Sequence, residues 1–419
     1  MNPLHVGMPE HGDVLDPTDV ERICEEALSD RSFEGRRVLA IIPDHTRTCP
    51  MDMMFERVCG ALKGRVKQLD FMIALGTHPP MSMDMIYRRV GITAEQHRED
   101  YPGVQFFNHA WNDPDQLVKV GRLTAQDTHD LTGGRFALDI DVTVNRRVLD
   151  YDLLLIIGPV FPHEVVGFSG GNKYIFPGIG GPELLNFFHW LGAVITNPMI
   201  IGNKLTPVRQ VVDRAAAMLP VERRAFCMVV KEGRLAGLYY GTPEDAWARA
   251  SDLSARLHIR HTGRSYHTVL SCAPAMYDEL WVGAKCMYKL EPVVADGGRL
   301  IIYAPHIRDV ATAHDATLKE IGYHTRDYFL AQWDTFKDYP WGVLAHSTHV
   351  KGIGTYENGI EHPRIEVILA TGIPEDVCQQ INLGYLDPAT IQVDEYRDRE
   401  DEGILYVPLA GEILYRMNP

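Results

Sequence analysis

The stretch Arg37-Val-Leu-Ala-Ile-Ile-Pro43 is a short apolar run that enters a polar turn at Asp44. Runs of the same kind lie at 66–75 and 152–158. Runs of strand length that are rich in leucine and β-branched residues are typical of buried parallel strands. Helix-like stretches alternate with them, at 52–62, 84–90 and 182–193. This alternation predicts an α/β fold with a mostly parallel sheet.

Polar residues follow the three apolar runs. Asp44 comes directly after the first run, His78 after the second and His163 after the third. Because active sites in open parallel sheets lie beyond the carboxyl ends of the strands, these residues are the first candidates for a functional site.

A second block of alternating elements begins near residue 265. Strands are expected at 266–271, 298–304 and 364–370, and a helix at 280–290. The turn near Gly263, after a charged helix at 242–257, is the predicted boundary. We therefore expect two α/β domains, 1–262 and 263–399, with an active-site cleft between them. The final stretch 400–419 is left open to either domain.

Composition and charge exclude several classes of protein function. The 419 residues are 45% hydrophobic and 23% charged, which is typical of a globular protein. The formal net charge of −15 argues against nonspecific nucleic-acid binding, because phosphates repel such a surface. No apolar run reaches the roughly 20 residues of a membrane helix, and Met1–Pro17 lacks the features of a secretory signal. We expect a cytoplasmic protein without a membrane partner, whose seven cysteines, none in a CxxC pair, are buried and reduced.

The most informative stretch is Phe161-Pro-His-Glu-Val-Val-Gly-Phe-Ser-Gly-Gly-Asn-Lys-Tyr-Ile-Phe-Pro-Gly-Ile-Gly-Gly181, with six glycines from Gly167 onward. Glycines allow backbone N–H groups to approach a ligand closely, and clustered N–H groups bind anions. Lys173 adds a positive charge or an amine nucleophile. The stretch predicts an anion-binding loop.

Two common motifs fit this loop poorly. A phosphate-binding P-loop needs Gly-Lys followed by Ser or Thr, but Asn172 precedes Lys173 and Tyr174 follows it. Ser169 formally matches the GxSxG motif of serine hydrolases, but an extended segment, not a helix, is expected at 174–178. A serine hydrolase using Ser169 stays the alternative.

The same residues resemble the lactate racemase (LarA) family of nickel-pincer enzymes. The resemblance rests on a spacing of ten residues from His163 to Lys173 and of sixteen from Lys173 to His189. It covers most of the chain. Its other motifs are Gly167, Ser169-Gly170-Gly171, Pro177-Gly178, Asp44-His45-Thr46-Arg47, Gly76-Thr77-His78 and Trp281-Val-Gly-Ala-Lys285.

The resemblance implies a cofactor, a pyridinium mononucleotide whose thioamide and thiocarboxylate hold nickel. Lys173 is the residue implied to form the covalent thioamide link, and His189 the residue implied to ligate nickel. Sulfur and imidazole are suitable ligands for Ni(II) in a square-planar site. Ser169, Gly170 and Gly171 are implied to hold the cofactor, with Lys204 or Arg209 as a suggested aid at its phosphate.

The resemblance also implies racemisation or epimerisation at C2 of a 2-hydroxy acid, through hydride transfer and a 2-keto acid. His78 and His163 are the implied acid–base pair, one for each face of the substrate, and the ordinary pKa of imidazole suits that task. Asp44 and Arg47 are implied to lie near cofactor and substrate. Arg47 is suited to hold a carboxylate or phosphate.

Lys285 is implied to bind the substrate carboxylate. Lactate-specific members have Tyr-Gln-Ser where this chain has Trp281-Val282-Gly283. Loss of the Gln removes a hydrogen-bonding group, and Gly283 is expected to open space, so a larger or more apolar substrate than lactate is indicated. His306, His346 and His349 and the loop 352–359 are further candidates to line the site.

Three hypotheses follow: a nickel-pincer racemase or epimerase, the serine hydrolase, and a noncatalytic binder of an anionic metabolite. The first is favoured because of the family resemblance. It implies a small-molecule 2-hydroxy acid and the enzymes of cofactor biosynthesis as partners.

Overall fold

The computed structural model describes residues 5–8 and 13–418. Part of the N-terminal stretch on which the expected absence of a secretory signal rests, residues 1–4 and 9–12, lies outside the described residues. The chain divides into two compact units, each built from separate segments. The first unit holds Met1–Phe161, Phe168–Leu185 and Arg209–Leu257, and the second holds Pro162–Gly167, Asn186–Val208 and His258–Pro419. The single boundary expected near residue 262 stays a prediction.

The first unit is built on a seven-stranded sheet of order β1-β11-β10-β7-β2-β3-β4. Neighbours from β10 to β4 are parallel, and β11 pairs antiparallel with β10 and β1. A separate antiparallel pair is formed by β5 and β6. The strands are β1 (His5–Gly7), β2 (Arg37–Pro43), β3 (Gln68–Ala74), β4 (Phe106–Asn108), β5 (Leu117–Leu123), β6 (Ile140–Asn145), β7 (Leu153–Pro159), β10 (Glu222–Lys231) and β11 (Arg234–Gly241).

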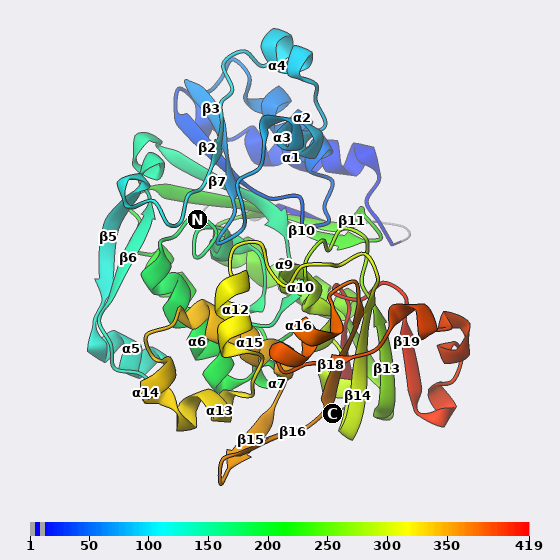
Figure 1. Cartoon of the computed structure of the whole chain (residues 1–419). Coiled ribbons are helices and arrows are strands. Elements are labelled where there is room, and N and C mark those ends of the chain that lie inside the picture. Colours follow the sequence, from blue (N-terminus) through cyan, green and yellow to red (C-terminus); the bar gives the residue numbers. More distant parts are fainter. Residues whose placement is uncertain (1–4, 9–12, 419) are drawn as a thin grey trace. The chain divides into compact units, whose positions relative to one another are not determined.

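Helices cover this sheet and bury its core. Apolar side chains of α1, α2 and α3 pack against β2, β3 and β7 in one cluster, and Figure 1 shows these blue helices beside the blue strands β2 and β3. Local signals begin and end the helices: Asp16 caps α1 before Pro17, and α3 ends at Gly91 with a φ of 72°. The helices up to residue 258 are α1 (Pro17–Leu28), α2 (Met51–Leu62), α3 (Met83–Val90), α4 (Ala94–Asp100), α5 (Ala125–Leu131), α6 (Pro182–Ile195), α7 (Asn197–Ile200), α8 (Pro207–Ala216) and α9 (Pro243–His258).

The second unit contains a five-stranded parallel sheet of order β18-β17-β14-β13-β19. The C-terminal strand β20 pairs with β12, and β19 pairs with β13. The final stretch 400–419, which the sequence did not assign to either domain, thus pairs with strands of this unit. Its strands are β12 (Ile259–Thr262), β13 (Tyr266–Cys272), β14 (Val294–Ala304), β15 (Gly354–Glu357), β16 (Ile360–Pro363), β17 (Glu366–Thr371), β18 (Gly384–Tyr385), β19 (Ile404–Val407) and β20 (Leu414–Met417); the short strands β8 (Pro162–His163) and β9 (Gly167–Phe168) also pair. Its further helices are α10 (Leu280–Gly283), α11 (Lys285–Tyr288), α12 (Asp315–Ile321), α13 (Arg326–Ala331), α14 (Trp333–Phe336), α15 (Trp341–Lys351) and α16 (Glu375–Gln380).

The α/β class with mostly parallel sheets is confirmed, and two local expectations are wrong. The single helix expected at 280–290 is two short helices, α10 and α11, that meet at Ala284. The segment 174–178, expected to be extended, follows a 3-10 helix at Gly171–Tyr174 and consists of turns. Among the described residues, no helix has the length and apolar character needed to cross a membrane.

Candidate functional site

The loop after β2 places Asp44 as a buried carboxylate, 4% exposed. Thr46 donates to Asp44 Oδ1 twice, from its backbone N–H at 3.0 Å and from its hydroxyl at 2.7 Å. Arg47 donates to the Thr46 hydroxyl oxygen at 2.9 Å. One carboxylate oxygen is therefore occupied by the loop itself, which fixes the orientation of the other.

The second oxygen of Asp44 meets His78 from the next strand. β2 and β3 are parallel and pair Pro43 with Ala74, so the turns that follow both strands begin at the same edge of the sheet. His78 Nδ1 lies 2.5 Å from Asp44 Oδ2. Burial on its own would raise the pKa of Asp44, but the charges of His78 and Arg47 and the hydrogen bonds from His78 and Thr46 hold it well below its ordinary value. An ionised Asp44 selects the tautomer with hydrogen on Nδ1 and leaves Nε2 of His78 as a base.

The glycine loop is fixed from behind by two side chains. Gly170 and Gly171 have φ values of 88° and 58°, which favour glycine. Arg209 donates to the carbonyl of Gly170 at 3.1 Å, and the indole N–H of Trp247 donates to the carbonyl of Ser169 at 2.9 Å. The Arg209 guanidinium also stacks 3.6 Å from the centre of the Trp247 ring. A Cβ at Gly171 would come within 3.0 Å of both side chains, so no larger residue fits there.

Asn172 anchors the 3-10 helix that carries Lys173. Its buried amide donates to Asp213 at 2.9 Å and Glu244 at 2.7 Å, and its oxygen accepts from Arg223 at 2.9 Å. The neighbouring Lys173 is half-buried, and its backbone N–H donates to the carbonyl of Gly170. The lysine therefore extends from a rigid turn.

Ser169 is not placed as a nucleophile. Its hydroxyl donates to the carbonyl of Pro159 at 3.1 Å and accepts the N–H of Phe161 at 2.9 Å. A nucleophilic serine needs a base at its hydroxyl and a helix directly after the elbow. The hydroxyl instead closes the turn between β7 and β9, and the hydrolase alternative lacks support.

His163 lies in the second unit, at the end of β8. Its Nδ1 is 3.1 Å from the N–H of Val165 and 3.2 Å from Glu164 Oε2. Nδ1 must lack a hydrogen to accept from Val165, and must carry one when the protonated ring forms an ion pair with Glu164. When Nδ1 accepts from Val165, the hydrogen of the neutral ring lies on Nε2.

His189 lies on α6, within a cluster of histidines in the second unit. Its ring stacks on Phe188 at 4.5 Å. Burial, followed by the charge of His189, lowers the pKa of His349 to about 3. Burial and then the charges of His349, His314 and His189 lower the pKa of His346. Helix α6 thus carries His189, and α15 carries His346 and His349, close enough for His189 to lower the pKa of both.

Lys285 is the first residue of α11, and its Nζ lies 4.6 Å from the centre of the Tyr277 ring. Trp281 precedes it by about one helical turn; its ring stacks on His346 at 3.9 Å and is tilted against His314 at 4.7 Å. A Cβ at Gly283 would meet one atom within 4 Å, Ile307 Cδ1 at 2.9 Å. The expectation that Gly283 opens space at the substrate stays a prediction.

Three comparisons place the chain among known proteins. Residues 19–199 match the model of the lactate racemase N-terminal domain. A protein of Thermotoga maritima is 31% identical in a crystal structure with a TM-score of 0.90, covering 98% of this chain and all of that one. The lactate racemase apoprotein of Thermoanaerobacterium thermosaccharolyticum has the same fold, at 16% identity and a TM-score of 0.71 over 94% and 92% of the two chains.

Two curated relatives with similar sequences are also named lactate racemase. The lactate racemase of Lactiplantibacillus plantarum is 24% identical over 195 residues, 45% of this chain and 41% of that protein. The chain belongs to the lactate racemase family. The lactate racemase of T. thermosaccharolyticum is 22% identical over 287 residues, 67% of this chain and 63% of that protein. The matches thus span less than two thirds of either curated racemase.

Within the lactate racemase family, the matched N-terminal domain contains nine of the predicted catalytic and cofactor-binding residues, whereas Lys285 lies outside it. The nine are Asp44, Arg47, His78, His163, Ser169, Gly170, Gly171, Lys173 and His189. The structure gives contacts at the site to two residues for which the sequence predicted no role, Thr46 and Trp247. Thr46 had a local signal, since Asp-x-Thr favours a side-chain turn. Trp247 had none, because its partner Arg209 is remote in sequence.

Proposed function

We propose that this chain is a racemase or epimerase that inverts C2 of a 2-hydroxy acid with a nickel-pincer nucleotide. The observation that carries the proposal is the Asp44–His78 pair at the carboxyl ends of β2 and β3. A carboxylate that orients an imidazole is the arrangement needed to take a hydroxyl proton. Membership of a family whose named relatives are lactate racemases supports it.

The donor groups present fit the cofactor. The half-buried amine of Lys173 extends from a rigid turn beside Gly170, where a Cβ would come within 2.5 Å of Val160 Cγ2. Lys173 would carry the covalent link, His189 would supply an imidazole ligand to nickel, and Ser169, Gly170 and Gly171 would border the nucleotide. When bound, the group supplies a hydride acceptor for C2, so that the substrate passes through a planar 2-keto acid.

The chain's own residues supply proton transfer and binding. His78 Nε2 takes the hydroxyl proton while Asp44 stabilises the imidazolium that forms. His163, with hydrogen on Nε2, returns a proton at the other face. Lys285 and Arg47 hold the carboxylate. The two histidines exchange roles when the reaction runs in the opposite direction, as a racemase requires.

Trp281 supports the proposed substrate class. Its indole is held by His346 and His314, one helical turn from Lys285. A large, fixed apolar surface near the carboxylate-binding lysine favours a 2-hydroxy acid with a larger or more apolar side chain than lactate.

The test is intact mass and nickel content of the protein coexpressed with the cofactor-making enzymes. The wild type is expected to carry an added mass and about one nickel per chain, and Lys173→Ala to carry neither. Chiral analysis of a panel of 2-hydroxy acids then identifies the substrate. An unmodified wild-type chain without nickel would contradict the proposal, and retained mass in Lys173→Ala would contradict the assignment of the lysine.

A further inference from the structure

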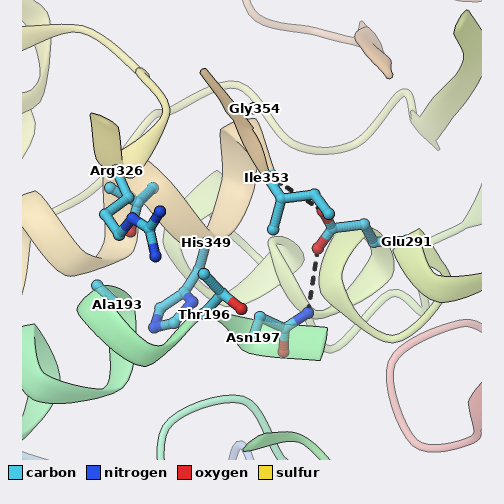
Figure 2. A pocket seen from close by; sticks show the side chains of 10 residues that line it. Ala193, Thr196, Asn197, Glu291, Arg326, His349, Ile353 and Gly354 are labelled. Atoms are coloured by element: carbon cyan, nitrogen blue, oxygen red, sulfur yellow. Dashed lines mark hydrogen bonds between the residues drawn. The ribbon is translucent and has the colours of Figure 1, made fainter. Parts of the chain in front are cut away.

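A small cavity lies in the second unit at the end of α6. Its volume is about 40 Å³. Figure 2 shows side chains from α6, α7, α13, α15 and the loop that follows α15 gathered around it. The residues that line it are Ala193, Thr196, Asn197, Glu291, Arg326, Thr348, His349, Gly352, Ile353 and Gly354.

Glu291 is a fully buried carboxylate on the wall of this cavity. It accepts the N–H of Ile353 at 2.7 Å and the amide of Asn197 at 3.2 Å, the two dashed lines in Figure 2. Among the described residues, no lysine, arginine or histidine nitrogen forms an ion pair with it. Burial raises its pKa, although the N–H of Ile353 and the charge of Arg364 act against the shift. Arg364 donates to the backbone carbonyl of Glu291 at 2.6 Å and not to its carboxylate, and a buried carboxylate without an ion-pair partner is costly.

Two more polar atoms of the lining residues have no hydrogen-bond partner in the described part of the chain. They are Nε2 of His349 and Oδ1 of Asn197, on side chains that are 4% and 3% exposed. The orientation of the Asn197 amide is fixed, because its nitrogen donates to Glu291 and to the carbonyl of Tyr288. Its oxygen is therefore an acceptor that lacks a donor or a cation.

Arg326 does not supply the missing charge. Its guanidinium pairs with Asp327 at 2.7 Å and donates to the carbonyl of Val194, in the last turn of α6, at 2.9 Å. It therefore caps the helix that carries His189. The cavity is left with a carboxylate, an amide oxygen and an imidazole that is neutral near pH 7, all of which offer lone pairs.

We propose that this cavity binds a monovalent cation of the sodium or potassium class, held by the Glu291 carboxylate and by neutral lone pairs of Asn197 and His349. One formal negative charge matches one monovalent ion. A volume of about 40 Å³ admits an ion with one or two waters, since each water needs roughly 10–15 Å³. The ion completes the polar partners that the protein leaves open.

The site has a structural consequence for α6. Thr196, which follows this helix directly and lines the cavity, has a φ of 92°, a conformation that β-branched residues rarely adopt. A cation bound between Glu291 and the α6–α7 junction opposes relaxation of this turn. We therefore expect bound potassium to stabilise the apoprotein, independently of any cofactor at Lys173.

Thallium(I), which scatters anomalously and replaces potassium, tests the site directly. Wild-type crystals grown without sodium or potassium and soaked in thallium acetate are expected to show an anomalous peak in the cavity, and Glu291→Gln crystals to lack it. Water alone in the cavity, or thallium only elsewhere on the protein, would overturn the proposal. A peak that persists in Glu291→Gln would overturn the role of the carboxylate.

Melting temperature in solution gives a second readout. At constant ionic strength, potassium chloride is expected to raise the Tm of the apoprotein to a plateau relative to tetramethylammonium chloride. Glu361→Gln is the matched control, because that carboxylate is paired with His324 at 2.8 Å, and it should keep the potassium effect. Equal Tm values in the two salts would contradict the proposal. If Glu291→Gln does not fold, the wild-type soak and titration decide.

Discussion

Asp44 divides its carboxylate between two partners, with Oδ1 bound to Thr46 and Oδ2 lying 2.5 Å from Nδ1 of His78. The pair is set by the strands, because the parallel register of β2 and β3 brings the following turns to one sheet edge. An imidazole oriented in this way has a defined tautomer before any substrate arrives. The first two predictions test this relationship.

Asp44→Asn should lower kcat roughly 10²- to 10⁴-fold in the loaded enzyme, with a smaller change in KM. An amide can donate to Nδ1 of His78, which then carries its hydrogen on Nε2 and no longer offers a base there. Steady-state kinetics on the best substrate of the panel measure the change. The exposed Asp338→Asn is the control and should match the wild type. Wild-type kcat in Asp44→Asn would remove Asp44 from the mechanism.

The same carboxylate should make stability depend on acid pH. The folded-state pKa of Asp44 lies well below the unfolded value of about 4. Its stabilisation is therefore complete above about pH 4 and is lost as the pH falls below that value toward the folded-state pKa. The Tm advantage of the wild type over Asp44→Asn should shrink as the pH falls from about 5 to 3. A difference that does not vary over this range would contradict the depressed pKa.

Arg209→Met should destabilise the first unit by about 1–3 kcal/mol, because the carbonyl of Gly170 and the carboxylate of Asp213 lose a buried donor. Urea denaturation of the apoprotein measures the loss. Arg214→Met on the same helix is the control, since Arg214 is exposed and should change the free energy of unfolding by less than about 0.5 kcal/mol. Equal effects of both substitutions would show that Arg209 does not hold the loop.

Gly283→Ala should cost about 1–3 kcal/mol, since its Cβ would press on Ile307 Cδ1 at 2.9 Å. Adding Ile307→Val removes that methyl group, so the double variant should be more stable than the sum of the two single effects predicts. Gly263→Ala, where a Cβ meets no atom within 4 Å, serves as the control. Additive effects would show that Gly283 is not constrained by Ile307.

Thiol labelling should distinguish one cysteine from the other six. Cys49 is half-buried, while the remaining cysteines are buried. Burial raises the pKa to about 12 for Cys24, Cys59, Cys227 and Cys286 and to about 11 for Cys272 and Cys378. At about pH 8 the native protein should therefore show at most one fast reaction with a disulfide reagent, and the denatured chain all seven. Several fast native thiols would contradict the burial of these residues.

Much of the fold follows from local sequence. The run 37–43 is a strand because its leucine and β-branched residues are buried on both faces, and the helix 182–193 extends two residues further than expected. The single helix expected at 280–290 is wrong, because α10 ends at Gly283 and α11 begins at Lys285, with Ala284 between them. Six of the seven cysteines are buried, as expected, whereas Cys49 is half-buried.

The candidate site was predictable only in part. Asp44 and His78 follow adjacent parallel strands, and their contact could be expected from that order. The Arg209–Trp247 support of the glycine loop could not, because no local pattern links the two residues. The roles of His163, Lys173, His189 and Lys285 rest on the family resemblance and stay predictions, as does a cytoplasmic location.

The segmented course of the chain has a consequence for its synthesis. The six segments of the two units require five passages of the chain between them. Trp190, 1% exposed, stacks on Trp333 at 5.4 Å within the second unit. Its partner is made 143 residues later (333 − 190), which takes roughly 7–30 s at 5–20 residues per second. During that time the ribosome presents an unpaired tryptophan and the apolar helix around it, an interval in which a chaperone that shields such surfaces would raise the yield of folded chain.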